Sequence, residues 1–246
     1  MSVKEFIQLS KSELSQNDFE LESTAQSLTE FANLVETIEL KNTDKMLDIG
    51  CGAGGFTNVI SRYFDIDETH GIDINPYLLN KAENHNIITH NIDIEKSSLP
   101  FNANSIPFVV CLGTLEHLSS YDKILSEIKR ILTKTGVVIF ALPNLGSWVN
   151  RASLLGGWQP RNVEISTKKT TNIAPWHANS EEVLGHKTTP TYNAFTELLE
   201  YYDYSIIDSK PLFPYQDSFI VKLIDNITKY RVQLARRVAF TVKIEK

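Results

Sequence analysis

Three aspartates and a run of glycines between residues 48 and 93 are the residues whose types and spacing point to chemistry. Asp48 ends a short apolar run and is followed at once by a glycine-rich turn. Glycines let a backbone touch a ligand, because no Cβ blocks the approach. A helix expected to begin near Phe56 brings free N–H groups and partial positive charge to the same place. The turn consists of Gly50, Cys51, Gly52, Ala53, Gly54 and Gly55.

The same glycines leave two cofactors to be weighed. Gly50, Gly52 and Gly55 satisfy the G-x-G-x-x-G pattern of dinucleotide-binding turns. A pyrophosphate at the helix N-terminus would be repelled by Asp48, whereas the sulfonium and ammonium groups of S-adenosylmethionine are attracted to an acid. Asp48 therefore favours S-adenosylmethionine as the cofactor. The alternatives are an NAD-dependent oxidoreductase and a module that binds S-adenosylmethionine without catalysis.

The other two aspartates follow the next two expected strands. Asp73 stands 23 positions after Gly50, where a carboxylate accepts from both hydroxyls of a ribose. Its structural alternative is to cap the helix that starts at Pro76, a role that Asn75 is equally able to fill. Asp93 stands where an acid accepts from an adenine amino group, and its structural alternative is a solvated loop residue.

Strand and helix patterns alternate along the chain, which predicts an α/β fold with a doubly wound parallel sheet. The run 108–112 is continuously apolar, as in strands buried on both faces. The expected strands are 46–49, 69–74, 87–92, 108–112, 137–142, 204–208 and 238–244. The expected helices are 21–38, 56–63, 77–84, 124–132, 191–202 and 216–236.

We expect one domain over residues 1–246. Residues 1–40 form a lid-like start and a helix, residues 41–143 the donor-binding core, and residues 190–246 the rest of the sheet with its covering helices. Residues 144–189 interrupt the alternation with an irregular stretch that contains all three tryptophans. Long irregular stretches inside a compact domain are usually functional, so this one is expected to cover the substrate.

Composition narrows the class of protein. The 246 residues carry a formal net charge of −6, which argues against non-specific nucleic-acid binding. The two cysteines form no C-x-x-C pair, and the N-terminus has no signal-peptide pattern. These features lead us to expect a cytoplasmic protein without a nucleic-acid partner. They leave its oligomeric state open.

Five motifs, in order and spacing, resemble the class I S-adenosylmethionine-dependent methyltransferases over about residues 45–143. That family has a Rossmann-like, seven-stranded sheet that is mostly parallel with an antiparallel last strand. The resemblance implies that the glycine turn holds the methionine part, Asp73 the ribose, and Ile92 with Asp93 the adenine edge. Ile74, Leu112 and Gly113 complete the implied donor site. The motifs are residues 47–54, 71–74, 93–101, 115–118 and 128–136.

The chain departs from the family at two places. The start of the fourth strand lacks the aspartate that many relatives have there. Some relatives bind magnesium through Glu-x-x-Glu-His, but Gly113 takes the first position here and leaves only Glu116 and His117. Hard cations need several oxygen ligands, so no metal is expected.

Three histidines are candidates for a general base, which methyl transfer to a poorly acidic hydroxyl requires. His117 follows the fourth strand, near the expected methyl group. His177 and His186 lie in the irregular stretch. For each histidine the structural alternative is a packed or surface residue without a catalytic role. For Glu116 the structural alternative is an acid that the helix dipole favours in the first turn of a helix.

The irregular stretch indicates the acceptor only broadly. It is similar to a subgroup of these methyltransferases associated with surface polysaccharides or methionine-related functions. Tryptophans stacking on a sugar, with Arg151 or Arg161 meeting an anion, would suit a glycan. We expect O-methylation of a small molecule or glycan. The apolar stripe of 216–236 leaves peripheral membrane contact open, although no run is long enough to span a membrane.

Overall fold

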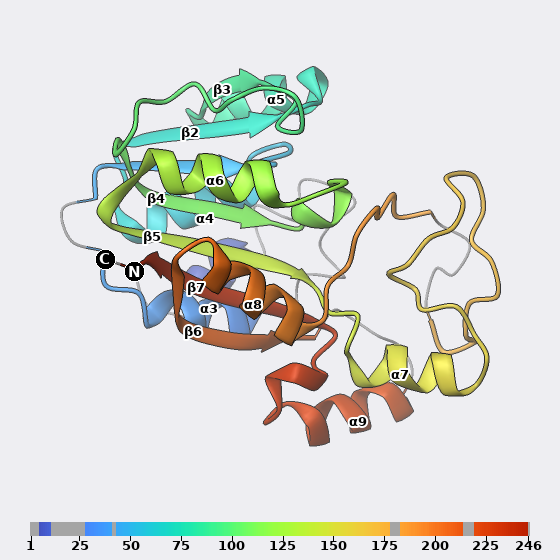
Figure 1. Cartoon of the computed structure of the whole chain (residues 1–246). Helices are drawn as coiled ribbons and strands as arrows, with labels where there is room; N and C mark the ends of the chain where they lie inside the picture. Colours follow the sequence, from blue (N-terminus) through green and yellow to red (C-terminus); the bar gives the residue numbers. More distant parts are fainter. Residues whose placement is uncertain (1–4, 11–27, 41–42, 178–182, 214–218, 246) are drawn as a thin grey trace.

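The computed structural model describes residues 5–10, 28–40, 43–177, 183–213 and 219–245. Seven strands form one sheet in the order β3-β2-β1-β4-β5-β7-β6 (Figure 1). The strands are β1 (Lys45–Ile49), β2 (Glu68–Asp73), β3 (Ile88–Asn91), β4 (Ile106–Leu112), β5 (Leu132–Pro143), β6 (Tyr204–Leu212) and β7 (Arg237–Ile244).

Strand directions follow the predicted fold class. Strands β1 to β5 pair in parallel, and β7 runs antiparallel to both β5 and β6. The expectation of a mostly parallel sheet with an antiparallel last strand is confirmed. Because β1, β2 and β4 are parallel neighbours, their carboxyl ends meet at one edge of the sheet. The turns after these three strands carry most of the predicted site residues.

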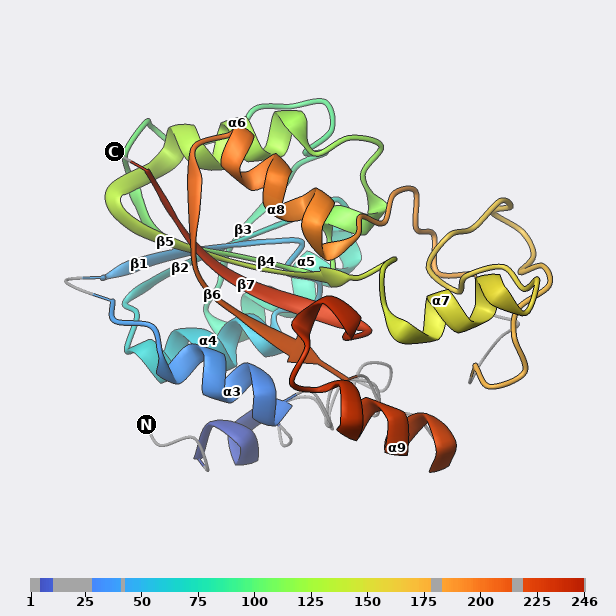
Figure 2. The same cartoon turned by 60° about the horizontal axis from the view of Figure 1, so that its bottom comes forward.

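Helices cover both faces of the sheet. In Figure 2, α6 and α8 lie on one face and α3 and α4 on the other. The helices are α3 (Leu28–Glu36), α4 (Gly55–Phe64), α5 (Pro76–Ala82), α6 (Asp122–Ile131), α7 (Trp148–Leu155), α8 (Tyr192–Tyr201) and α9 (Phe219–Thr228), with 3-10 turns η1 (Glu83–His85), η2 (Leu115–His117) and η3 (Val232–Leu234). None of the described helices is long and apolar enough to cross a membrane.

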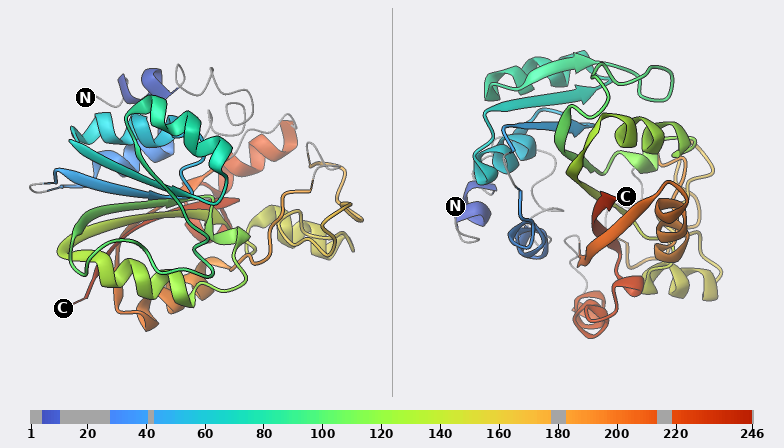
Figure 3. Two further views of the ribbon diagram at one scale, coloured as in Figure 1. Left: turned by 90° about the horizontal axis from the view of Figure 1, so that it is seen from above. Right: turned by 60° about the vertical axis from the view of Figure 1, so that its left-hand side comes forward.

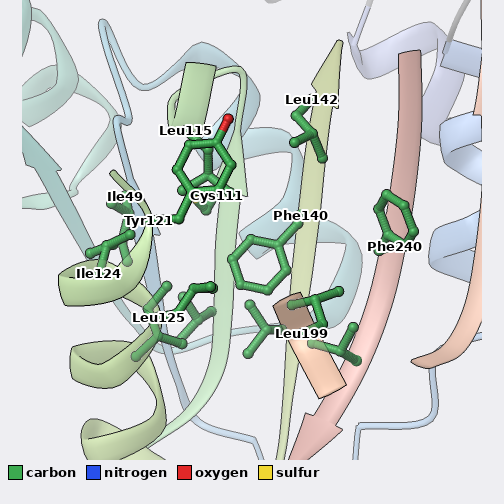
Figure 4. Close-up of a cluster of buried hydrophobic side chains, with 14 of the residues drawn as sticks. Ile49, Cys111, Leu115, Tyr121, Ile124, Leu125, Phe140, Leu142, Leu199 and Phe240 are labelled. Carbon is green, nitrogen blue, oxygen red and sulfur yellow. The ribbon is translucent and has the colours of Figure 1, made fainter. Parts of the chain in front are cut away.

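Alternating strand residues build two separate cores. Val109 and Cys111 of β4 face α6 and α8, whereas Phe108 and Val110 face α3 and α4. This alternation is the period-2 geometry of a strand buried on both sides. Figure 4 shows part of the first core, where Phe140 of β5 lies among Leu125, Leu199 and Phe240. The cores hold the strand ends, and with them the site turns, in fixed positions.

The N-terminal expectation is corrected where the chain is described. Residues 5–10 are helical, and Phe6 is fully buried in the core on the α3 and α4 side. Its ring makes edge contacts with Phe56 and Tyr63. This part is therefore anchored by aromatic packing and is not a loose start. The expected helix 21–38 is described only as α3, and residues 11–27 lie outside the described residues.

The helix expected at 216–236 is wrong in its second half. Helix α9 ends at Thr228, and Arg231 begins a separate turn with extended backbone (φ −124°, ψ 90°). The break lets the chain fold back so that Arg236 pairs with the buried Asp225 at 2.8 Å. A continuous helix would carry Arg236 away from that carboxylate. Four side chains of this region are well exposed, namely Ile220, Leu223, Ile227 and Tyr230.

The irregular stretch leaves and rejoins the sheet at one narrow neck. The N–H of Leu145 donates to the carbonyl of Pro190 at 2.9 Å. Asn144, which is 2% exposed, donates from its amide to the carbonyls of Gln233 and Ala235. Its side-chain oxygen accepts from the N–H groups of Gly146 and Tyr192. Both ends of the stretch are thus fixed to the same asparagine, and Figure 3 shows the stretch projecting beyond the sheet.

Candidate functional site

The glycine turn adopts a backbone that only glycine takes easily. Gly50, Gly52 and Gly54 have φ of 80°, 52° and 80°. The N–H groups of Gly50 and Cys51 both donate to the carbonyl of Ile72, at 2.7 and 3.0 Å, which ties the turn to β2. A Cβ on Gly50 would lie 2.0 Å from Oγ1 of Thr114. The turn is therefore fixed from two sides by neighbouring strands.

Asp48 lies beneath this turn. It is 5% exposed, and its Oδ2 accepts from the hydroxyl of Thr57 on α4 at 2.5 Å. Its negative charge raises the pKa of the Cys51 thiol, in addition to the larger effect of burial. The acid thus acts on the turn as a buried charge. A buried carboxylate at this point opposes an anion on the turn and favours a cation.

Asp73 links the glycine turn to the start of α5. Its Oδ2 accepts from the N–H of Gly52 at 3.0 Å, and its Oδ1 accepts from the N–H of Asn75 at 2.8 Å. The helix cap is supplied by Asn75, whose side chain accepts from the N–H of Tyr77. Asp73 is therefore free of the capping role. An ionised carboxylate has about four acceptor positions, so two remain for hydroxyl donors.

The N-terminus of α4 is open to a ligand. Within the described residues, no side chain caps this helix at Gly54. No described atom lies within 4 Å of the position that a Cβ on Gly52 would take. The free N–H groups of the first turn suit a carboxylate, such as the one at the amino-acid end of S-adenosylmethionine. The turn thus combines donors for that carboxylate with a buried acid for the cationic groups.

The predicted adenine side is arranged differently from the ribose side. Asp93 accepts from the N–H of Glu95 at 3.0 Å and pairs with Lys96 at 2.6 Å. The Lys96 hydrogen bond holds the pKa of Asp93 below its usual range. Both oxygens of Asp93 therefore already order the turn after β3. Ile74 is 66% exposed and Ile92 is half-buried, so both offer apolar surface at this end of the sheet.

The turn after β4 closes the donor side, and one of its residues was missed by sequence reasoning. Thr114 donates its hydroxyl to the carbonyl of Ile49 at 3.0 Å and packs against Gly50. Leu112 is half-buried, and Gly113 has a φ of 68° with its N–H bonded to the carbonyl of Ala141. A threonine shows no distinctive spacing, so no sequence signal marked it.

The comparisons with known proteins agree with this geometry. The family model of a methyltransferase domain matches residues 47–140. These residues include the glycine turn, Asp73, Asp93 and the turn after β4. Residues 47–140 are thus similar to a methyltransferase domain, within a chain that has the fold of S-adenosylmethionine-dependent methyltransferases. The cofactor of such domains is S-adenosylmethionine, as the residues predicted.

Solved structures share the fold of this chain. An S-adenosylmethionine-dependent methyltransferase from Listeria monocytogenes superposes with a TM-score of 0.59 at 16% identity, over 88% of this chain and 98% of that one. A Haloferax volcanii methyltransferase, solved in complex with the Trm112 methyltransferase activator, gives a TM-score of 0.64 at 13% identity, over 98% of both chains. At these identities the likeness concerns the fold alone.

Curated relatives are more similar to this chain in sequence, but over less of their length. The protein MJ0638 of Methanocaldococcus jannaschii is 32% identical over 120 residues, 49% of this chain and 50% of that protein. The sterol 24-C-methyltransferase erg6 of Schizosaccharomyces pombe is 26% identical over 124 residues, 47% of this chain and 32% of that enzyme. The chain thus spans half or less of the length of these two relatives.

Beside the predicted donor side, three residues singled out from the sequence lie close together. Glu116, His117 and His186 each place a possible ligand or proton-accepting atom within 4.8 Å of the other two. We call these three the Glu-His-His cluster. The imidazole rings of His117 and His186 have centroids 5.2 Å apart. A Cβ on Gly113 would lie 3.7 Å from Oε1 of Glu116, so the cluster adjoins the donor side directly.

The charge state of the cluster follows from its surroundings. Glu116 is 1% exposed, and Arg237 lies 3.4 Å from its Oε1. Burial, together with His117 and Arg237, lowers the pKa of His186 to about 4, so this imidazole is neutral at pH 7. Nδ1 of His117 lies 3.2 Å from the carbonyl of Gly185 and donates to it. In the neutral form of this ring, Nε2 is the nitrogen that carries the lone pair.

Glu164 holds the backbone of residues 184–186, and with it His186, in place beside the cluster. We call these contacts the Glu164 clasp. The carboxylate of Glu164 accepts from the N–H groups of Leu184, Gly185 and His186 at 2.6, 2.6 and 3.1 Å. Burial acts to raise the pKa of Glu164, but these three donors outweigh it and the pKa lies below its usual range. Sequence reasoning missed Glu164, because a single acid in an irregular stretch has no spacing that marks it.

Replacing Glu164 with alanine is expected to release residues 184–186 and to lower the free energy of unfolding by about 3 kcal/mol, since a buried charged acceptor with three donors is lost. Amide hydrogen exchange at these three positions should speed up at least about tenfold. The exposed Glu197→Ala serves as the control. Unchanged exchange in Glu164→Ala would show that the clasp does not hold this segment.

His177 lies outside the Glu-His-His cluster. Burial lowers its pKa to about 4, with Arg161 and Arg236 acting in the same direction. Among the described residues, no partner hydrogen-bonds to its Nε2. The ring is neutral in the folded protein and takes up a proton in the unfolded chain below about pH 6.5.

This difference predicts a pH dependence. The contribution of His177 to the free energy of unfolding is fully present above about pH 6.5 and is lost as pH falls to about 4, by at most roughly 3 kcal/mol. The His177→Gln variant should therefore lose less stability than the wild type in urea titrations across this window. His85→Gln is the control, and equal slopes in His177→Gln and the wild type would contradict the assignment.

The aromatic and basic residues expected to meet a sugar are used largely for packing. Trp158 and Trp176 contact each other edge to face with centroids 4.9 Å apart. The indole N–H of Trp148 donates to Asp225 at 2.7 Å, which links α7 to α9. Arg161 is 8% exposed and faces Glu164 at 3.4 Å. Of the two arginines considered, only Arg151 is exposed, and its Nε donates to the carbonyl of Gly146 at 2.7 Å.

Proposed function

We propose that this protein transfers a methyl group from S-adenosylmethionine to a hydroxyl oxygen of a small molecule or glycan. The observation that carries the proposal is that the turn after β4 contacts the glycine turn and also contains two residues of the Glu-His-His cluster. Thr114 bonds the end of β1 beside the glycine turn, and two residues later Glu116 begins the Glu-His-His cluster. A donor on the glycine turn and an acceptor at the cluster would therefore meet at Gly113.

The donor-side roles follow from the contacts. The bound cofactor supplies an activated methyl group on a sulfonium. We assign its carboxylate to the open N-terminus of α4, its ribose hydroxyls to the remaining acceptor positions of Asp73, and its adenine to the apolar surface of Ile74 and Ile92. Asp48 provides the buried negative charge beneath the turn.

The acceptor-side residues position a hydroxyl and favour loss of its proton. Methyl transfer from a sulfonium is an in-line displacement, in which alignment and exclusion of water lower much of the barrier. A hydroxyl also needs a proton acceptor. The cluster offers neutral imidazole and carboxylate lone pairs at the place where the hydroxyl would lie. This combination supports an oxygen acceptor, and residues 144–189 would enclose it.

Two measurements test the proposal in sequence. Calorimetry should show micromolar binding of S-adenosylhomocysteine and no binding of NADH. Binding of NADH without binding of S-adenosylhomocysteine would instead support an NAD-dependent oxidoreductase. The similarity of residues 47–140 to a methyltransferase domain argues against that alternative. Labelled methyl groups should then pass from S-adenosylmethionine to the small-molecule or glycan fraction of a cell extract, separated from lipids and RNA.

The outcomes of the transfer assay separate the remaining alternatives. Donor binding without a labelled product in any fraction would identify a non-enzymatic binding module. Label in RNA would overturn the expected acceptor class, and label in lipids would support the membrane contact left open by the exposed apolar residues of α9. A His117→Gln variant that keeps full transfer would remove the cluster from the reaction.

A further inference from the structure

We propose that Glu116, His117 and His186 bind a divalent transition-metal ion of the zinc class. Two imidazoles and one carboxylate are a ligand set used for such ions, whereas magnesium and calcium take oxygen ligands. The expectation of no metal relied on Glu116 and His117 alone. The structure adds His186, nearly 70 residues away, as the third ligand.

An unpaired buried atom is one argument for an ion. Across the described residues, no hydrogen-bond partner is found for Oε2 of Glu116, and Nε2 of His186 lies 4.0 Å from Oε1 of the same carboxylate. Glu116 is 1% exposed and the side chain of His186 is 9% exposed. Buried polar atoms without partners cost free energy, and a bound cation would satisfy the carboxylate.

His117 already makes the hydrogen bond that metal-binding histidines usually make, and the backbone of His186 is fixed beside Glu116. Metal-binding histidines are neutral and usually donate their other ring nitrogen to a carbonyl or carboxylate. His117 does so toward the carbonyl of Gly185. Glu164 fixes the backbone of His186, and the N–H groups of Lys187 and Thr188 donate to the carbonyl of Glu116 at 2.8 and 3.2 Å. Two ligands are thus held by one hydrogen-bonded unit.

The three side chains are near the geometry of a metal site, but their ligand atoms are too far apart to hold an ion without some movement. Tetrahedral zinc with nitrogen and oxygen ligands places them about 3.3 Å apart, given bonds of about 2.0–2.1 Å. The cluster atoms lie within 4.8 Å of one another, so the widest pair has to approach by up to about 1.5 Å. His117 is exposed and has room to make this movement, while Glu116 is fixed by burial.

Another group of histidines in the chain shows why this cluster differs. His70, His90 and Glu68 also meet, but Nδ1 of His70 contacts Nε2 of His90 at 3.0 Å and Nε2 of His70 contacts Glu68 at 2.6 Å. The two nitrogens of His70 point in opposite directions, so the group forms a hydrogen-bonded chain. It lies on β2 and β3 and supplies a matched control for metal binding.

The role of the ion in catalysis rests on the proposed function, whereas its binding does not. Beside Gly113, it would meet the oxygen of an acceptor bound next to the donor and lower the pKa of that hydroxyl. Arg237 opposes the ion, because its guanidinium lies 3.4 Å from Oε1 of Glu116. This repulsion gives the proposal an outcome that simple loss of structure would not produce.

Cobalt(II) is the probe, added to full-length protein that carries no histidine tag, and its visible absorption reports coordination. Glu116→Gln and His186→Gln should each weaken cobalt binding about 100-fold, with zinc displacing the cobalt in the wild type. His90→Gln should bind as the wild type does. Arg237→Gln should bind about tenfold more tightly, because a positive charge beside the ion is removed. Circular dichroism melts check that each variant is folded.

The results that overturn the inference are distinct from those that overturn the proposed function. Equal cobalt binding by the wild type, Glu116→Gln and His186→Gln would mean adventitious surface binding, and no absorption change in the wild type would remove the site. Calorimetry with S-adenosylhomocysteine on the same samples tests the donor side separately. Donor binding without cobalt binding would overturn the metal site alone, and cobalt binding without donor binding would overturn the proposed function alone.

Discussion

Replacing Asp73 with alanine is expected to weaken binding of S-adenosylhomocysteine about 100-fold or more. Hydrogen bonds to a charged group contribute about 1.5–3 kcal/mol each, and two ribose hydroxyls would lose their acceptor. The N–H of Gly52 would lose its partner as well, which loosens the glycine turn itself. Calorimetry measures the effect directly, and the fold should persist because Asn75, not Asp73, caps α5.

Two comparisons make the Asp73 result specific. Asp67→Ala removes an exposed acid near the start of β2 and should leave the donor affinity unchanged. Asp73→Asn keeps the shape of the side chain but loses the charge and one acceptor oxygen, so its affinity should fall between the wild type and Asp73→Ala. Unchanged affinity in Asp73→Ala would remove Asp73 from the donor site.

Replacing Gly50 with alanine is expected to abolish donor binding and to lower the free energy of unfolding by about 3 kcal/mol or more. Two costs add at this position. The residue has a φ of 80°, and the new Cβ would lie 2.0 Å from Oγ1 of Thr114. Thr114 cannot simply turn away, because its hydroxyl bonds the carbonyl of Ile49 and its own Cβ is also within 2.9 Å.

Gly157→Ala carries the backbone cost without the contact. Gly157 has a φ of 77°, and within the described residues nothing lies within 4 Å of the position of its Cβ. Its replacement therefore carries only the backbone cost of about 1–2 kcal/mol. Urea unfolding of both variants gives the difference, which is the cost of the contact with Thr114. Equal losses in the two variants would show that the glycine turn has room to adjust.

Local patterns explain why much of the donor side was predictable. The glycine turn and Asp73 each lie close in sequence to the strand that precedes or contains them. The alternation of short strands and helices predicts a parallel sheet, in which the carboxyl ends of these strands lie at one edge. Asp48 lies in the predicted strand directly before the glycine turn, but its bond to Thr57 was not foreseen. Thr57 lies on the buried face of α4, where a threonine resembles any small packed residue.

The acceptor side depends on contacts that no local pattern records. His186 was one of three histidines considered, and nothing in its neighbours indicated a meeting with Glu116. That meeting depends on Glu164, which holds residues 184–186 from the other end of an irregular stretch. The end of α9 was likewise misplaced, because apolar periodicity continues past Thr228 while the pairing of Arg236 with Asp225 turns the chain back.

The neck at Asn144 has a consequence for how such a protein can diversify. Because Leu145 bonds Pro190 and Asn144 binds both ends, the two ends of the segment are held together by contacts that its interior does not make. The segment also contacts the rest of the chain through Trp148 and residues 185–188. We therefore expect sequence changes between these contacts to leave the sheet and the glycine turn in place.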